Sequence, residues 1–196
     1  MSKVSMGNRL AETFYNMDII KQKEIAIYSY LFNYLFGGIL YDVCILFIGL
    51  LINQIDISLC YILTTTPLRQ FAGGYHAKTP LRCEIISYLT YFLILILSTS
   101  NICGLLPPII YIITYILCWT VIFRIAPVDT AAKRLSLSQK RKLKSFLIIT
   151  FLIMTFISFL FLIYKIHLFI TVCMCVIIFT IGLYSAYIIN ARQETF

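Results

Sequence analysis

The chain has 196 residues, of which 61% are hydrophobic and only 12% are charged. This composition excludes a soluble globular domain, and the length leaves no room for a separate soluble domain beside a membrane-embedded one. We therefore predict a single integral membrane domain over residues 1–196. The net charge of +8 is also typical of nucleic-acid binding, but the chain has no soluble recognition module, so we expect no nucleic-acid partner.

Residues 1–24 carry scattered charges and no compact apolar run. Apolar residues recur among the polar ones in a loosely helical rhythm, at Val4, Leu10, Phe14, Met17 and Ile20. This spacing predicts an amphipathic helix that lies on the membrane surface.

About six apolar stretches follow, at residues 25–52, 57–68, 85–100, 105–123, 146–164 and 168–189. Most are long enough to cross a hydrocarbon core of roughly 30 Å, which predicts an all-α, polytopic membrane protein. The second stretch is the exception, because about twelve helical residues cover only some 18 Å. We expect it to be a half-helix, a strongly thinned crossing, or a continuation of the next polar loop into the membrane.

That polar loop, residues 69–83, contains one of the two histidines, His76, and a cysteine seven residues later, Cys83. A neutral imidazole takes a proton from a thiol to make a nucleophilic thiolate, so the pair predicts a catalytic dyad. On one straight helix the two would lie roughly 10 Å apart along the axis, so the chain must bend between them. Thr79 and Pro80 predict an N-cap and a first helical residue. Cys83 then falls in the first turn, where helix N–H groups favour a thiolate.

Four further residues of this loop are candidates for positioning the substrate. Gly73 and Gly74 allow the backbone to approach a substrate closely, while Arg69 and Gln70 are candidate donors to a developing oxyanion. A histidine and a cysteine at this spacing have little specificity by themselves.

Three carboxylates are candidates for orienting His76. Asp42 lies in an apolar run, where a carboxylate must pair, protonate or line a cavity, and it could equally face a second subunit, which leaves a homodimer open. Asp129 and Glu84 are the alternatives. Glu84 adjoins the nucleophile, but neighbours on a helix point apart.

The other six cysteines lie in or beside apolar runs, where a thiol behaves as a small hydrophobic group. They are Cys44, Cys60, Cys103, Cys118, Cys173 and Cys175. We expect no bound metal and no cofactor.

Residues 125–145 form a predicted basic loop with two compatible roles. Its cations are Lys133, Arg134, Lys140, Arg141, Lys142 and Lys144. They predict an anchor on anionic lipid, and also a docking site for acidic segments of a peptide. If the N-terminus is inside and all six stretches cross, Lys165 is the only Lys or Arg outside, so we expect the short second stretch to act as a crossing despite its length. Both termini and the loops 69–83 and 125–145 are then cytoplasmic.

The string Arg-x-x-x-Gly-Gly-Tyr-His-Ala followed by Cys, between hydrophobic segments, closely resembles the accessory gene regulator B (AgrB) family of Gram-positive bacteria. The patch Ala126-Pro127-Val128-Asp129-Thr130 and the basic run after it also look like the family's pattern. Members are endopeptidases of the bacterial cell membrane that process the precursor of a cyclic quorum-sensing peptide. The resemblance implies that His76 is the catalytic histidine and Cys83 the nucleophile, with Arg69 and Gly74 at motif positions. It also implies a thiolactone or lactone product.

Two other functional classes remain open. A small transporter would place Asp42 and the glycine-rich loop in a substrate path, without covalent chemistry. A noncatalytic membrane adaptor would use the basic loop as its docking surface.

Overall fold

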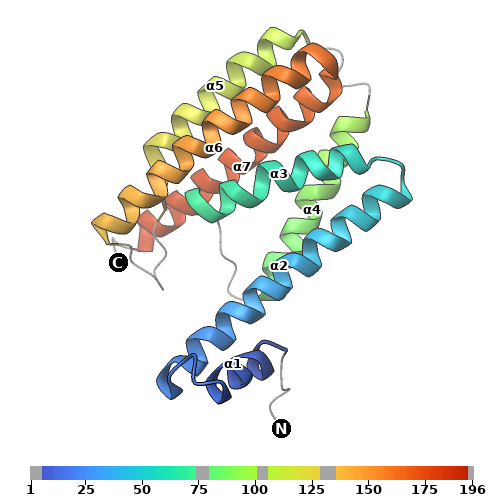
Figure 1. Cartoon of the computed structure of the whole chain (residues 1–196). Helices are drawn as coiled ribbons and strands as arrows, with labels where there is room; N and C mark the ends of the chain where they lie inside the picture. Colours follow the sequence, from blue (N-terminus) through green and yellow to red (C-terminus); the bar gives the residue numbers. More distant parts are fainter. Residues whose placement is uncertain (1–5, 74–79, 101–105, 129–135, 194–196) are drawn as a thin grey trace. The chain divides into compact units, whose positions relative to one another are not determined.

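A computed structural model describes residues 6–73, 80–100, 106–128 and 136–193 (Figure 1). Within these ranges the chain is helical and forms no strand. Five of the helices in the described part of the chain are long and apolar enough to cross a membrane, which confirms the predicted polytopic all-α fold. The helices group into two units, Met1–Leu51 and Ile52–Phe196.

The first unit is a helical hairpin in which α1 (Met6–Asn16) packs on α2 (Ile25–Leu51), with a short 3-10 turn, η1 (Gln22–Glu24), between them. The amide of Gly7 donates to Asn33 Oδ1 over 3.1 Å, and the Phe14 and Phe32 rings lie 5.4 Å apart. A Cβ on Gly7 would meet Asn33 Oδ1 at 2.6 Å, so this approach requires glycine. The predicted helix over residues 1–24 is therefore confirmed only in part, because α1 ends at Asn16, before the predicted apolar positions Met17 and Ile20. Its place on the membrane surface stays a prediction.

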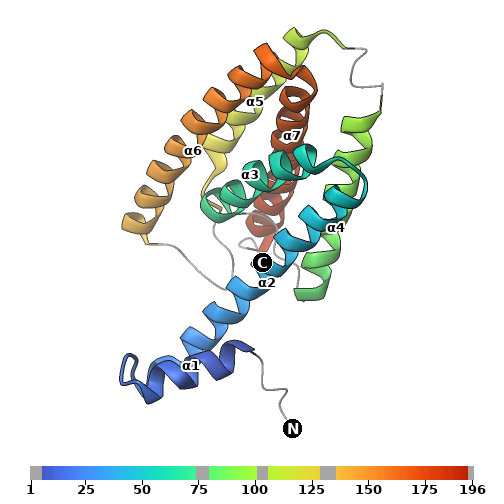
Figure 2. The ribbon, with the colours of Figure 1, turned by 45° about the vertical axis from the view of Figure 1, so that its right-hand side comes forward.

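The second unit contains α3 (Ile55–Ala72), α4 (Pro80–Thr99), α5 (Pro108–Ile125), α6 (Leu137–Tyr164) and α7 (Ile166–Gln193). Within it, α7 packs against the other four helices, and α5, α6 and α7 run side by side (Figures 1 and 2). Aromatic residues join α5 to α6: Trp119 is buried and its ring centroid lies 4.9 Å from that of Phe151. The core of this unit therefore surrounds the last helix of the chain.

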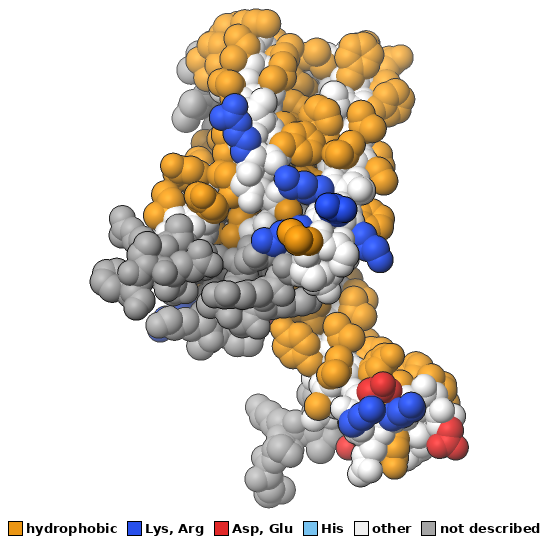
Figure 3. Space-filling model, turned by 90° about the vertical axis from the view of Figure 1, so that its left-hand side faces the viewer, with side chains coloured by type: hydrophobic (Ala, Val, Ile, Leu, Met, Phe, Trp, Pro, Cys, Tyr) orange, Lys and Arg blue, Asp and Glu red, His pale blue; other side chains and the backbone are white. Residues whose placement is uncertain are grey.

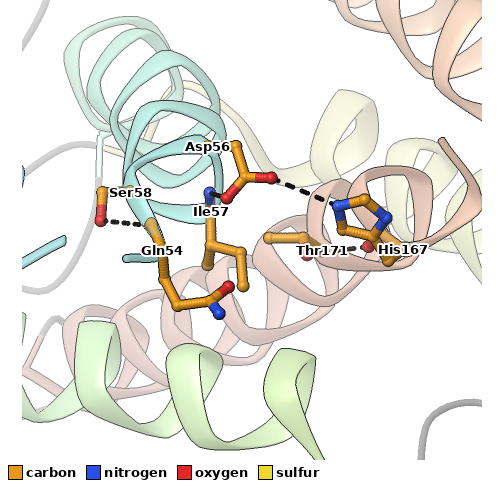
Figure 4. A network of polar contacts seen from close by, with 6 residues as sticks. All are labelled: Gln54, Asp56, Ile57, Ser58, His167 and Thr171. Carbon is orange, nitrogen blue, oxygen red and sulfur yellow. Dashed lines mark hydrogen bonds and ion pairs between the residues drawn. The ribbon is translucent and has the colours of Figure 1, made fainter. Parts of the chain in front are cut away.

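Contacts at both ends of α3 fix its direction within the second unit. At its start, Asp56 Oδ2 lies 3.3 Å from His167 Nε2 at the start of α7 (Figure 4). At its end, the Ala72 carbonyl accepts a hydrogen bond from the amide of Val128, just after α5. Helices α3, α5 and α7 therefore point the same way.

Helix α3 is longer than the sequence predicted. The stretch 57–68 was expected to form a half-helix, a strongly thinned crossing, or a continuation of the polar loop into the membrane. The helix instead continues to Ala72 and has 18 residues, about 27 Å at 1.5 Å per residue. The reason is that Leu68 and Ala72 are fully buried, so the apolar side of the helix extends past the polar Arg69 and Gln70. The predicted loop 69–83 thus loses its first four residues to α3 and its last four to α4.

Helix α6 also begins earlier than predicted. It starts at Leu137, so Lys140–Lys144 are helical and do not belong to a loop reaching residue 145. The cause is a capping box at Ser136: its hydroxyl accepts from the Gln139 amide, and Gln139 Oε1 accepts from the Ser136 amide. The pattern Ser-x-x-Gln before the basic run was the sequence signal for this start.

Candidate functional site

The end of α3, the start of α4 and the segment after α5 supply the described parts of the predicted site. Gly73, which follows α3, has φ 81° and ψ −161°, a conformation open mainly to glycine. A Cβ on Gly73 would lie 3.2 Å from the Val128 carbonyl oxygen. The sequence motif after Ala126 therefore lies against the beginning of the glycine-rich motif.

Cys83 is the fourth residue of α4, which begins at Pro80 as the sequence predicted. Its thiol is free and half-buried, whereas Cys60, Cys173 and Cys175 are buried in the second unit. His76, Gly74 and Thr79 lie outside the described residues, so the His76–Cys83 geometry and the Thr79 cap stay predictions. The start of α4 at Pro80 confirms the predicted first-turn position of the candidate nucleophile.

Arg69 reaches from α3 to α4, and this contact was missed by the sequence analysis. Its Nη1 donates to Ser87 Oγ over 2.7 Å, and Ser87 Oγ donates to the Cys83 carbonyl over 2.9 Å. Gln70, the next residue, is exposed. The arginine predicted to position substrate is thus linked, through Ser87, to the turn that carries the candidate nucleophile.

The three carboxylates that are candidates for orienting His76 lie in different parts of the chain. Glu84 is exposed on α4, one residue beyond Cys83. Asp42 lies in α2 of the first unit and is half-buried, and Asp129 lies outside the described residues. The choice among the three therefore stays open.

The basic residues of α5 and α6 border an open pocket of about 340 Å³. Its lining comprises Arg124, Ile125, Ala126, Pro127, Leu137, Lys140, Arg141 and Lys144. Lys142, on the same helix, is not part of the lining, and Lys133 and Arg134 lie outside the described residues. On the face drawn in Figure 3, Lys and Arg side chains gather among hydrophobic ones. Four cations and no carboxylate thus surround a space that could receive an anionic group.

A second contact that the sequence analysis missed lies at the opposite end of α3. Its Asp56 carboxylate accepts from the Ile57 amide over 2.9 Å and faces His167, whose side chain is 52% exposed (Figure 4). Their separation in the sequence gave no signal of this pairing. An exposed pair of this kind contributes little to stability.

Comparison with curated proteins and with solved structures finds no match to this chain. A family model described as accessory gene regulator B matches residues 7–187. The matched range includes Arg69, His76, Cys83 and the basic pocket, and it covers nearly the whole chain. The chain therefore belongs to the accessory gene regulator B family.

Proposed function

We propose that this protein is a membrane-embedded cysteine endopeptidase that cleaves a pheromone precursor at the cytoplasmic membrane face and promotes cyclisation of the product. Membership of the family supports involvement in quorum-sensing peptide processing. The observation that carries the catalytic proposal is the half-buried Cys83 in the first turn of α4, directly after the segment that contains His76.

The proposed first step is acyl transfer to the cysteine. His76 accepts the thiol proton, and the Cys83 thiolate attacks the scissile carbonyl carbon. The protonated imidazole then donates that proton to the leaving amine as the carbon–nitrogen bond breaks. The C-terminal part of the precursor departs, and the N-terminal part stays on Cys83 as a thioester.

The proposed second step is cyclisation within the bound precursor. A thiol or hydroxyl of the precursor attacks the thioester carbonyl and transfers its proton to His76. The Cys83 thiolate leaves, so a thiolactone or lactone forms and the enzyme is regenerated. Excluding water from the site favours this ring closure over hydrolysis.

The experiment that tests this function is co-expression with a candidate short precursor peptide, followed by mass measurement of the products. We expect a C-terminal fragment and a cyclic product lighter by one water than the corresponding linear fragment. A transporter or an adaptor would leave the precursor mass unchanged. An intact precursor in cells with correctly inserted protein, for every candidate precursor tested, would contradict the proposal.

We further propose that the basic pocket between α5 and α6 receives an acidic segment of the precursor. Arg124, Lys140 and Lys144 border the same space, and a low-dielectric membrane surface strengthens their attraction for carboxylates. The pocket begins at Ala126 and Pro127, next to Val128, which is bonded to Ala72 beside Gly73. An anionic segment bound there would lie close to the start of the catalytic motif. Anchoring on anionic lipid remains compatible with this role.

A further inference from the structure

We propose that Ser87 is a positioning residue, which couples the Arg69 guanidinium to the turn of α4 that carries Cys83. The inference rests on the proposed function and adds a residue that the family motif does not contain. It begins from a short chain of hydrogen bonds, from Arg69 to Ser87 and from Ser87 to the Cys83 carbonyl.

The Ser87 hydroxyl suits this bridging role. A serine oxygen has one proton to donate and two lone pairs, so it can donate to the Cys83 carbonyl while it accepts from Arg69. The bond from the guanidinium is charge-assisted, and its 2.7 Å length is at the short end of such bonds. Ser87 is only 5% exposed, so little water competes for these partners.

The backbone of Ser87 is held as well. Tyr61 of α3 donates its hydroxyl to the Ser87 carbonyl over 3.2 Å, and the fully buried Tyr61 and Tyr91 rings pack edge to face at 5.3 Å. The hydroxyls of Ser58 in α3 and Tyr91 in α4 form a further hydrogen bond between the two helices, with a length of 2.8 Å. The serine therefore projects from a rigid part of the helix interface toward the end where the candidate nucleophile lies.

The consequence concerns Arg69, which is otherwise an exposed residue at the end of α3. A long arginine side chain samples many rotamers, and a fixed partner selects one of them. One N–H of the five in the guanidinium is used by Ser87, which holds that end of the group near the turn that carries Cys83. Loss of the Ser87 hydroxyl would release the guanidinium without removing its charge.

Thr90 provides a matched control on the same helix. Its hydroxyl donates to the Ile86 carbonyl over 2.7 Å, the same local bond that Ser87 makes to Cys83. In the described part of the chain, no hydrogen bond from Thr90 reaches another helix. Thr90→Ala thus removes a hydroxyl from α4 while leaving the Arg69 contact in place.

The test compares steady-state cleavage by reconstituted variants, normalised to correctly inserted protein. We expect Ser87→Ala to lower kcat by about tenfold with little change in KM, because misplaced groups act on the chemical step. Thr90→Ala should cleave like the wild type. Ser87→Ala combined with Arg69→Ala should be no slower than Arg69→Ala alone, since both changes remove the same coupling.

A second pair of variants guards against a folding defect. Ser87→Thr keeps the hydroxyl and Ser87→Val removes it at nearly equal volume, so the threonine variant should be several-fold faster than the valine variant. Equal cleavage rates for Ser87→Thr and Ser87→Val, or a wild-type rate for Ser87→Ala, would overturn the role of Ser87. If Cys83→Ala is inactive in the same assay, the proposed function still stands. Cleavage by Cys83→Ala itself would instead overturn the proposed function.

Discussion

At the scale of single residues, the surroundings of Cys83 distinguish it from the other described thiols of the second unit. Cys60, Cys173 and Cys175 are buried in the helix packing, and Cys118 is half-buried in the interior of α5, whereas Cys83 is half-buried in a first helical turn. A thiol that reacts must be reached by a substrate, and a helix start beside a polar segment favours such access. The position of a cysteine along its helix therefore indicates the candidate nucleophile better than the number of cysteines in the chain does.

Replacing either member of the proposed dyad should abolish precursor cleavage. We expect Cys83→Ala, His76→Ala and the double variant to be equally inactive, because both side chains act in one chemical step and their losses are not additive. Cys83→Ser should be nearly as damaging, since a serine hydroxyl is far less ionised than a thiol. Mass measurement of the precursor, with membrane insertion checked in parallel, tests this; normal cleavage by the His76 variant would disprove the dyad.

Gly73 should be sensitive to substitution for a backbone reason. A side chain at its φ and ψ costs about 1–3 kcal/mol, and the added Cβ would also press on the Val128 carbonyl. Gly73→Ala should therefore lower the free energy of unfolding in detergent by about that amount. Gly182→Ala in α7 is the control, because its Cβ would meet no atom within 4 Å. Equal stabilities of the two variants would argue against strain at Gly73.

At the scale of helices, the sequence predicted which helices form better than it predicted where each one begins and ends. Apolar runs located all the described helices of the second unit, but α3 and α6 each extend into polar sequence. Burial of Leu68 and Ala72 extends the first, and the Ser136 capping box starts the second. A hydropathy pattern locates the middle of a helix but not its ends. For α6, the capping-box sequence from Ser136 to Gln139 is the local pattern that predicts where the helix starts.

The helical form of the basic run gives a sharper test of precursor docking than removing every charge. Lys144 borders the pocket and Lys142 does not, although both are exposed cations on the first turns of α6. One such charge contributes about 1 kcal/mol near an anionic surface, so Lys144→Gln should raise the apparent KM for an acidic precursor by roughly fivefold. Its kcat should stay nearly unchanged.

The matched control is Lys142→Gln, which removes the same charge from outside the pocket. We expect it to keep the wild-type KM, and we expect the wild-type KM to rise with salt because mobile ions screen the attraction. Steady-state cleavage in reconstituted, correctly oriented protein measures both. Equal KM values for the two variants would support a role in lipid anchoring alone.

At the scale of the whole molecule, the predicted site was only partly readable from sequence. The two motif patches predicted Arg69, His76, Cys83 and the segment around Val128 by residue type and order. The pattern did not reveal the bond from Arg69 to Ser87 or the bond from Val128 to Ala72. No local pattern in the sequence marks a serine on a membrane helix as the partner of an arginine on another. Such contacts depend on how α3 and α4 pack, which periodicity does not specify.

The direction of α3 also bears on membrane topology. Its start contacts the start of α7, and its end contacts the segment after α5, so the two ends of α3 lie at opposite ends of the second unit. Arg124 and the cations of α6 lie at the end with Ala72, and Lys165 lies at the other. This arrangement supports the expectation that α3 behaves as a crossing although it is not one of the five most apolar helices.

Labelling of engineered cysteines should therefore differ across α3. In a variant whose native cysteines are replaced, we expect Gln54→Cys and Lys165→Cys to react in intact cells with a membrane-impermeant maleimide. Gln70→Cys and Ser138→Cys should react only after permeabilisation, because the excess of Lys and Arg keeps their side of the protein in the cytoplasm. Reaction of Gln54→Cys and Gln70→Cys from the same side would rule out a crossing α3. Outside labelling of Ser138→Cys would reverse the orientation and separate the proposed active site from a precursor made in the cytoplasm.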